Sequence, residues 1–220
     1  MDIVQIDDQP IAATFFGEVH RLTDFVTPEA LEIQDLYEQI THNIASTREK
    51  LTACWKWVTS NVRYVHFVKG KIWIEGESFS QGDLWQDPSM TIHTKVGNCA
   101  NSAMLLTSLV RNTLPPDQAY CALGNLHSNQ PGGHAWTQVS LDEDSYIMEA
   151  TTSKAPPLVP ASSAKQYEAV HYFNDKNVLA VAGKTQMVPY AECFSTWLQD
   201  YLNFTYIEEQ RRLHLIKAQS

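Results

Sequence analysis

The chain has 220 residues, of which 44% are hydrophobic and 10% aromatic, and this composition excludes a disordered or low-complexity protein. Its 16 lysine and arginine residues stand against 25 aspartate and glutamate residues, which gives a formal net charge of −9. Nucleic acids and anionic membrane surfaces bind basic proteins, so neither is expected as a partner.

Two helices are predicted after an arm of irregular or strand structure over residues 1–27. The first is expected from Pro28 to about Asn43, because Thr27 can cap it and a proline is tolerated at the first helical position. The second is expected from about Thr47 to Asn61, where apolar residues recur at helical spacing. Residues 63–75 predict a strand pair that turns near residues 69–70, and residues 76–97 are expected to form a loop.

The next segment predicts a buried helix from Cys99 to Asn112. Its apolar residues cover most of the helix circumference, and a helix of this kind is enclosed on most sides. Gly97 and Asn98 mark its beginning, and asparagine is a good N-cap. Cys99 is therefore expected in the first turn of a central helix.

Strands are predicted beyond this helix, at Gln118–Gly124, His134–Leu141 and Tyr146–Ala150. The second has Ala135, Thr137 and Val139 on one face and Trp136, Gln138 and Ser140 on the other. Residues 142–144 are expected to form a tight connection to the third strand.

The last part of the chain predicts another hairpin, with strands at Tyr167–Phe173 and Val178–Ala182 around residues 175–176. Two closing helices are expected near Glu192–Asn203 and Thr205–Ala218. The sequence does not indicate what residues 156–220 contribute to function, nor the oligomeric state.

Three residues carry groups suited to catalysis, namely Cys99, His134 and Glu149. They are expected at a helix start, a strand start and near the end of the following strand. His134 lies nine residues before Glu143 and Glu149 lies six after it. This mismatch leaves open a bulge, a longer loop, or an offset between the two residues along the strand pair.

The predicted position of Cys99 favours a nucleophile. A helix N-terminus presents unpaired N–H groups and partial positive charge, which stabilise a thiolate. A histidine can hold the ion pair and later protonate a leaving amine, and a carboxylate behind the histidine fixes its orientation. The backbone N–H of Cys99 is placed to help form an oxyanion hole.

Three stretches resemble the transglutaminase-like superfamily. They are Gly97-Asn98-Cys99-Ala100-Asn101, Gly133-His134-Ala135-Trp136-Thr137-Gln138-Val139 and Tyr146-Ile147-Met148-Glu149-Ala150-Thr151. The stretch from Trp57 to Tyr64 resembles the helix-to-strand passage of the same core, so that the resemblance covers about residues 47–152.

The resemblance implies an α+β fold with a papain-like core, in which a central buried helix packs on an antiparallel sheet. It implies thiol acyl transfer through an acyl-enzyme on Cys99, without a cofactor or a metal ion. We expect a single domain over residues 1–220, with its core at about 28–155 and a C-terminal extension at about 156–220.

The chain departs from the family pattern at two positions. Glu149 stands where aspartate is usual and Ala150 where proline is usual, so the longer carboxylate must retract to meet the histidine. The side-chain donor of the oxyanion hole stays open among four residues upstream of the cysteine: Trp73, Gln81, Trp85 and Gln86. We expect Trp85, Trp136 and Asn98 to contribute to substrate binding.

The other cysteines are Cys54, Cys121 and Cys193, which are expected to be buried core residues and free thiols. No CxxC pair is present, so a structural zinc site is not expected. The N-terminus lacks the features of a secretory signal, and no apolar run reaches the length of a transmembrane helix. These observations favour a cytoplasmic location.

Several functions fit these residues. Water as the acceptor gives a peptidase or amidase, which we favour, acting on a peptide, a protein or a small amide. An amine as the acceptor gives a transglutaminase or an amide-forming acyltransferase. The alternatives outside acyl transfer are an inactive binding module and, more weakly, a metal site built from Cys99, His134 and Glu149.

Overall fold

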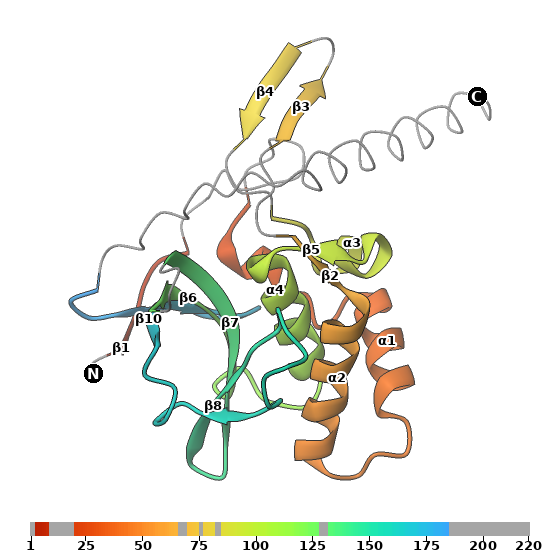
Figure 1. The fold of residues 1–220 in the computed structure, drawn as a ribbon, viewed down its shortest axis with the longest axis vertical. Coiled ribbons are helices and arrows are strands. Elements are labelled where there is room, and N and C mark those ends of the chain that lie inside the picture. Colours follow the sequence, from red (N-terminus) through yellow and green to blue (C-terminus); the bar gives the residue numbers. More distant parts are fainter. Residues whose placement is uncertain are drawn as a thin grey trace.

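The structure is a computed structural model that describes residues 3–8, 20–65, 70–74, 77–81, 85–127 and 132–184. Within these ranges, a group of helices packs against an antiparallel sheet (Figure 1). The predicted α+β class is confirmed. None of the described helices is both long enough and apolar enough to cross a membrane.

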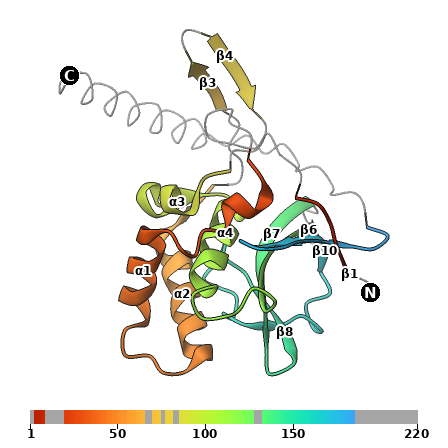
Figure 2. The same ribbon diagram turned by 180° about the vertical axis from the view of Figure 1, so that it is seen from behind.

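The helices lie to one side of the sheet, with α4 between the sheet and the others, as both ribbon views show (Figures 1 and 2). They are α1 (Leu31–Thr41), α2 (Thr47–Asn61), α3 (Pro88–Thr94) and α4 (Cys99–Val110), preceded by the 3-10 helix η1 (Leu22–Phe25). Helix α4 contacts strands β6 and β7 of the sheet on one side and α1, α2 and α3 on the other.

The main sheet has the strand order β1-β11-β10-β6-β7-β8-β9 among the described residues, and every neighbouring pair is antiparallel. Its strands are β1 (Ile3–Gln5), β6 (Ala119–Leu126), β7 (Gly132–Leu141), β8 (Asp144–Met148), β9 (Val159–Pro160), β10 (Tyr167–Phe173) and β11 (Val178–Val181). Two smaller pairs are the parallel β2 (Arg63–Tyr64) with β5 (Val96–Gly97) and the antiparallel β3 (Gly70–Ile74) with β4 (Glu77–Gln81).

Helix α4 is the buried centre that the sequence predicts, and all of its residues are buried. The Asn98 side chain caps it, because its Oδ1 accepts a hydrogen bond from the backbone N–H of Asn101 at 3.1 Å. Gly97 is required just before the cap, since a Cβ there would lie 2.7 Å from the Asn101 Cβ. The cap and the close approach together determine where α4 begins.

The polar residues inside α4 join the helix to strand β7. Thr137 on β7 donates a hydrogen bond to the carbonyl of Ala103 at 3.1 Å, and its hydroxyl lies 3.0 Å from that of Thr107. Ala135 and Val139 lie in apolar clusters with residues of the helices, whereas Trp136 lies in a separate cluster with Ile147. The predicted alternation of β7 is confirmed.

Strands β7 and β8 are joined by a two-residue turn at Asp142 and Glu143, which both adopt left-handed backbone conformations. The pairing runs from Leu141 with Asp144 to Thr137 with Met148 without a bulge. The mismatch between His134 and Glu149 is therefore an offset along the strand pair.

Helix α2 has the predicted bounds, but α1 begins at Leu31 instead of Pro28 and its N-cap is Ala30 instead of Thr27. The backbone N–H of Thr27 donates to the Ser108 hydroxyl of α4 at 3.0 Å. This contact holds residue 27 against the core, and a turn in which the Ala30 N–H bonds to the Thr27 carbonyl precedes the helix.

The prediction for residues 63–97 is wrong in two respects. Strand β2 pairs with β5 and strand β3 pairs with β4, so the predicted strand pair within residues 63–75 is not formed. The predicted loop contains α3 and β5 as well as β4. Asp87 caps α3 with Pro88 in its first turn, a helix signal that the glycine-based loop prediction overlooked.

The hairpin of β10 and β11 is confirmed around residues 175–176. The two predicted closing helices and Cys193 lie outside the described residues. Cys54 and Cys121 are buried and free, as expected.

Candidate active site

Cys99 is the first residue of α4, and its side chain is nearly enclosed, with 2% of the residue exposed. The residue belongs to an apolar cluster that also contains Ala100, Met104 and Cys121. Its thiol hydrogen-bonds to the side chain of His134. The cysteine is therefore placed at the positive end of a buried helix with an imidazole beside it.

His134 lies near the start of β7 and is 7% exposed. Its Nε2 lies 2.8 Å from Oε2 of Glu149. Because this nitrogen is engaged with the carboxylate, Nδ1 is the ring nitrogen left to face the Cys99 thiol. The structure thus brings together the three residues that the sequence singled out, which lie at the start of α4, on β7 and directly after β8.

Glu149 follows the last residue of β8, and several donors hold its carboxylate. Oε1 accepts hydrogen bonds from the backbone N–H of Thr151 at 2.9 Å and from the Thr151 hydroxyl at 2.6 Å. Oε2 accepts from the Tyr167 hydroxyl at 2.8 Å, in addition to its contact with His134. The backbone carbonyl of Glu149 accepts from Nε1 of Trp55 at 2.7 Å, which ties this segment to α2.

The pKa values of the pair indicate that both partners are charged at neutral pH. Burial opposes the charge on His134, but the hydrogen bonds to Cys99 and Glu149 outweigh it and raise the His134 pKa to about 10. Burial also opposes the charge on Glu149, but hydrogen bonds from His134 and Thr151 lower the Glu149 pKa to about 2. An imidazolium beside the sulfur stabilises a thiolate, which is the nucleophilic form.

Two predicted substrate-binding residues lie directly beside the catalytic candidates. Asn98 is the buried cap of α4. Trp136 is 1% exposed, and its ring stacks on His134 with the ring centroids 6.2 Å apart. The tryptophan therefore packs against the face of the imidazole. A contact of Trp136 or of Asn98 with substrate stays a prediction.

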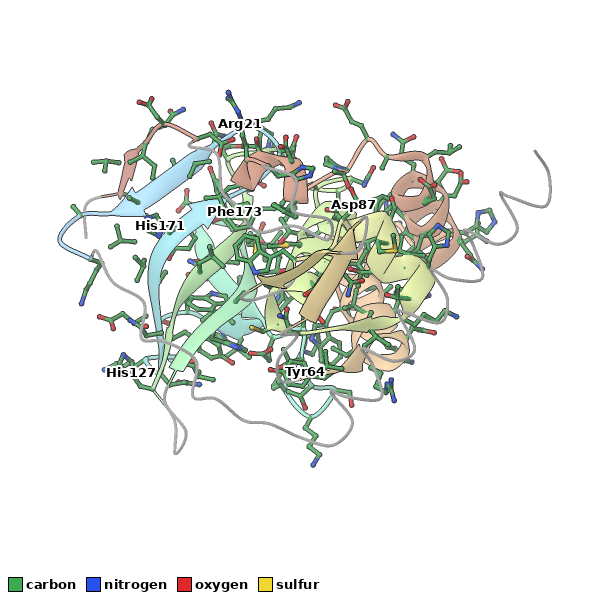
Figure 3. All side chains as sticks on the ribbon, turned by 90° about the horizontal axis from the view of Figure 1, so that it is seen from above. Arg21, Tyr64, Asp87, His127, His171 and Phe173 are labelled. Atoms are coloured by element: carbon green, nitrogen blue, oxygen red, sulfur yellow. The ribbon has the colours of Figure 1, made fainter. Side chains whose placement is uncertain are left out.

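Trp85, the third of these residues, is partly buried and packs against the apolar cluster that contains Cys99. Its ring meets Phe25 edge to face with centroids 5.4 Å apart and stacks on Phe173 at 6.4 Å. Phe173 is fully buried, and Figure 3 labels it in the interior of the molecule. A role of Trp85 in substrate binding or in the oxyanion hole stays a prediction.

Gln86, another oxyanion candidate, is fully buried just upstream of the cysteine. Its Nε2 donates to the carbonyl of Val96 at 3.2 Å, and its Oε1 accepts from the Thr94 hydroxyl at 3.0 Å. These contacts join it to the strand that leads into α4. The side chains of Trp73 and Gln81 lie outside the described part of the structure.

Sequence reasoning did not assign roles to Thr151, Tyr167 and Trp55. Thr151 carries a local signal, since a threonine two residues after a carboxylate can donate to it from both backbone and side chain. Tyr167 and Trp55 come from β10 and α2, and no spacing rule connects them with Glu149. No cluster of three or more histidine, cysteine or acidic residues in the described ranges is arranged to hold a metal ion.

The model of the transglutaminase-like superfamily matches residues 34–148, which is more than half of the chain. The chain belongs to the transglutaminase-like superfamily. The match ends one residue before Glu149, so the carboxylate and its donors Thr151 and Tyr167 lie beyond it. A comparison with curated proteins gives no significant match.

Two solved structures of one protein show the same fold. Legionella pneumophila LapG superposes with a TM-score of 0.51 at 18% identity, covering 69% of this chain and 77% of LapG. The EGTA-treated form of LapG gives 0.50 at 17% identity, over 71% and 78%. A candidate cysteine protease from Cytophaga hutchinsonii gives 0.42 at 21% identity, over 77% of this chain and 56% of that protein.

Proposed function

We propose that this member of the transglutaminase-like superfamily is a cysteine peptidase or amidase that cleaves an amide bond through an acyl-enzyme on Cys99. The observation that carries the proposal is the continuous hydrogen-bonded series from the Cys99 thiol through His134 to Glu149. Each member of this series is buried; Cys99 lies on α4, His134 on β7 and Glu149 directly after β8.

In the first half of the reaction, the Cys99 thiolate attacks the carbonyl carbon of the amide and the carbonyl π electrons move to oxygen. The backbone N–H of Cys99 is placed to donate to that oxyanion. The intermediate collapses as the C–N bond breaks, and the His134 imidazolium gives its proton to the leaving amine. The products of this half are a thioester on Cys99, a free amine and a neutral imidazole.

In the second half, the neutral imidazole of His134 takes a proton from water as the water oxygen attacks the thioester. The resulting tetrahedral intermediate collapses as the C–S bond breaks, so that the acid product leaves and the thiolate and imidazolium are restored. Glu149 stays charged throughout and holds His134 in the orientation that both proton transfers need. An amine in place of the water gives amide formation on the same machinery.

The test is intact mass spectrometry of the wild-type protein and Cys99→Ala after incubation with a panel of peptide, amide and thioester donors. We expect a covalent acyl adduct on the wild type that maps to Cys99 and decays as the acid is released. Addition of an amine distinguishes the two acceptors by the ratio of products, since a transferase gives mainly the amide and a peptidase gives mainly the acid. The absence of any adduct across the panel, with Cys99 intact and the protein folded, would contradict the proposal.

A further inference from the structure

Tyr167 shares an acceptor atom with the candidate catalytic histidine. Its hydroxyl donates to Oε2 of Glu149 at 2.8 Å, and the same oxygen lies 2.8 Å from Nε2 of His134. The tyrosine ring lies 6.1 Å from the His134 ring and forms a T-shaped pair with Trp136 at 5.1 Å, measured between centroids. The phenol is thus locked beside the histidine by both packing and hydrogen bonding.

The Tyr167 hydroxyl can act only as a donor here. Burial raises the pKa of this phenol, and the neighbouring charge of Glu149 raises it further. The group is therefore protonated at neutral pH, where the carboxylate is charged. It therefore directs its proton at Oε2 and takes no part in proton transfer.

A glutamate at this position needs more support than an aspartate, because its extra methylene adds a rotatable bond. Thr151 holds Oε1 with two hydrogen bonds. A carboxylate held at one oxygen can still swing about that oxygen, whereas donors on both oxygens fix its plane. Tyr167 supplies the fixed donor at the second oxygen, the one that faces His134.

The fold directs Tyr167 to this place through a bulge in β10. Ala169 pairs with Gly124 of β6 and His171 pairs with Leu123, so that one residue of β10 is left over between them. A one-residue bulge reverses the alternation of the strand before it. Tyr167 accordingly lies in the same apolar cluster as Tyr172, five residues away, and as Trp136 of β7.

We propose that Tyr167 is a positioning residue for the acyl-transfer reaction, which holds Glu149 where it orients His134 toward Cys99. The inference rests on the proposed function for its catalytic meaning. It adds a fourth residue to Cys99, His134 and Glu149, and this residue lies on a strand outside the family match, which ends at residue 148.

The experiment is a double-mutant cycle with Tyr167→Phe and Glu149→Gln. The readout is the rate at which iodoacetamide alkylates Cys99 across pH 5–9, because this rate follows the thiolate and needs no substrate. Phenylalanine keeps the ring packing and removes only the hydroxyl, and thermal melting checks that each variant is folded. Tyr172→Phe is the matched control, since this half-buried tyrosine lies on the same strand and bonds to Gln138 instead.

We expect Tyr167→Phe to slow alkylation about tenfold at neutral pH and to change its pH profile, as the loss of a hydrogen bond to a charged group does. In the Glu149→Gln background the same change should have little effect, because the tyrosine acts through the carboxylate. Tyr172→Phe should leave the rate and profile unchanged. A wild-type profile for Tyr167→Phe, or an equal slowing in both backgrounds, would overturn the proposal.

The acyl-adduct test and this cycle fail separately. If Cys99 forms an acyl-enzyme while Tyr167→Phe is alkylated at the wild-type rate, only the role of Tyr167 is wrong. If no donor acylates Cys99 while the cycle shows the expected coupling, only the proposed reaction is wrong.

Discussion

The Glu149 carboxylate accepts four hydrogen bonds, one from His134, one from Tyr167 and two from Thr151. These hydrogen bonds explain how a buried acid remains charged, since desolvation alone would favour its neutral form. At the residue scale, the site therefore depends on the donors around the acid as much as on the acid itself.

The charge of Glu149 should make the stability of the protein depend on pH. Its pKa falls from 4.5 to about 2 on folding, so its contribution is present above pH 4.5 and is lost as the pH falls toward 2. We expect Glu149→Gln to lower the free energy of unfolding by roughly 2–3 kcal/mol at neutral pH, and by less at pH 3. Urea unfolding at pH 7, 5 and 3 measures the difference.

The contribution of His134 to stability depends on pH in the opposite direction, because its pKa rises from 6.5 to about 10 on folding. Its contribution is complete below pH 6.5 and is lost as the pH rises through 10.

The exposed Glu38 on α1 provides the control for Glu149→Gln, because Glu38→Gln should leave the stability nearly unchanged at each pH. A constant difference between the wild type and Glu149→Gln from pH 7 to pH 3 would contradict this account.

At the element scale, the N-terminal end of helix α4 carries both its cap, Asn98, and the candidate nucleophile, Cys99. We expect Asn98→Ala to cost about 1 kcal/mol of stability, as the loss of an N-cap does, and to slow the alkylation of Cys99 because the first turn loosens. Ser46→Ala is the matched control, since Ser46 caps α2 by accepting from Glu49 at 3.5 Å. It should cost similar stability and leave the alkylation rate unchanged. Equal rates for both variants would show that the cap of α4 has no bearing on the cysteine.

The bulge in β10 depends on a glycine in the neighbouring strand. A Cβ on Gly124 would lie 2.1 Å from the backbone carbonyl oxygen of Glu168, which cannot move aside without disrupting the sheet. We expect Gly124→Ala to lower the free energy of unfolding by about 3 kcal/mol or more. Gly183→Ala serves for comparison, because a Cβ at Gly183 would meet no atom within 4 Å. Its φ of 78° leaves only about 1 kcal/mol of backbone strain to be expected. Denaturant titration that ranks the two variants in the reverse order would contradict the role of the close approach.

The elements that the sequence predicts well are those with local signals. Helix α2 has a regular apolar face, α4 has a cap and a continuous apolar surface, and the hairpin of β7 and β8 has a short turn between alternating strands. The start of α1 was misplaced because a contact between Thr27 and Ser108 joins residues 81 positions apart. Pairings of this kind leave no trace in local spacing.

At the scale of the whole molecule, the site forms only where helices and sheet meet. Cys99 comes from the helical layer, His134 and Glu149 come from the sheet, and Trp55 of α2 holds the carbonyl of Glu149. The sequence predicts the first three because their motifs resemble a family, while Tyr167 and Trp55 become visible only when the chain is folded.

A buried ion pair joins the two layers at the far end of α4. Nε of Arg111 lies 2.7 Å from Asp175 in the β10–β11 connection, and both side chains are more than nine-tenths buried. We expect Arg111→Ala to destabilise the protein by about 3 kcal/mol, because it removes the buried partner of Asp175 and leaves the carboxylate with the exposed Lys176, whose Nζ lies 3.6 Å away. Folded molecules of this variant should still be alkylated at Cys99 at the wild-type rate, since the pair lies beyond the C-terminal end of α4. Denaturant unfolding and alkylation together check both parts, and a slowed rate at full folding would mean that the far end of α4 influences the cysteine.

Among the three cysteines in the described residues, we propose that His134 activates Cys99 alone. Burial raises the pKa of Cys54 to about 12 and raises that of Cys121 well above its ordinary value, so both thiols should be inert at neutral pH. The most direct measurement is brief treatment of the folded protein with iodoacetamide at pH 7, followed by peptide mass mapping of wild type and His134→Ala. The account predicts a label on Cys99 that is lost or strongly reduced in His134→Ala, whereas equal labelling of all the cysteines, or of Cys99 in both proteins, would contradict it.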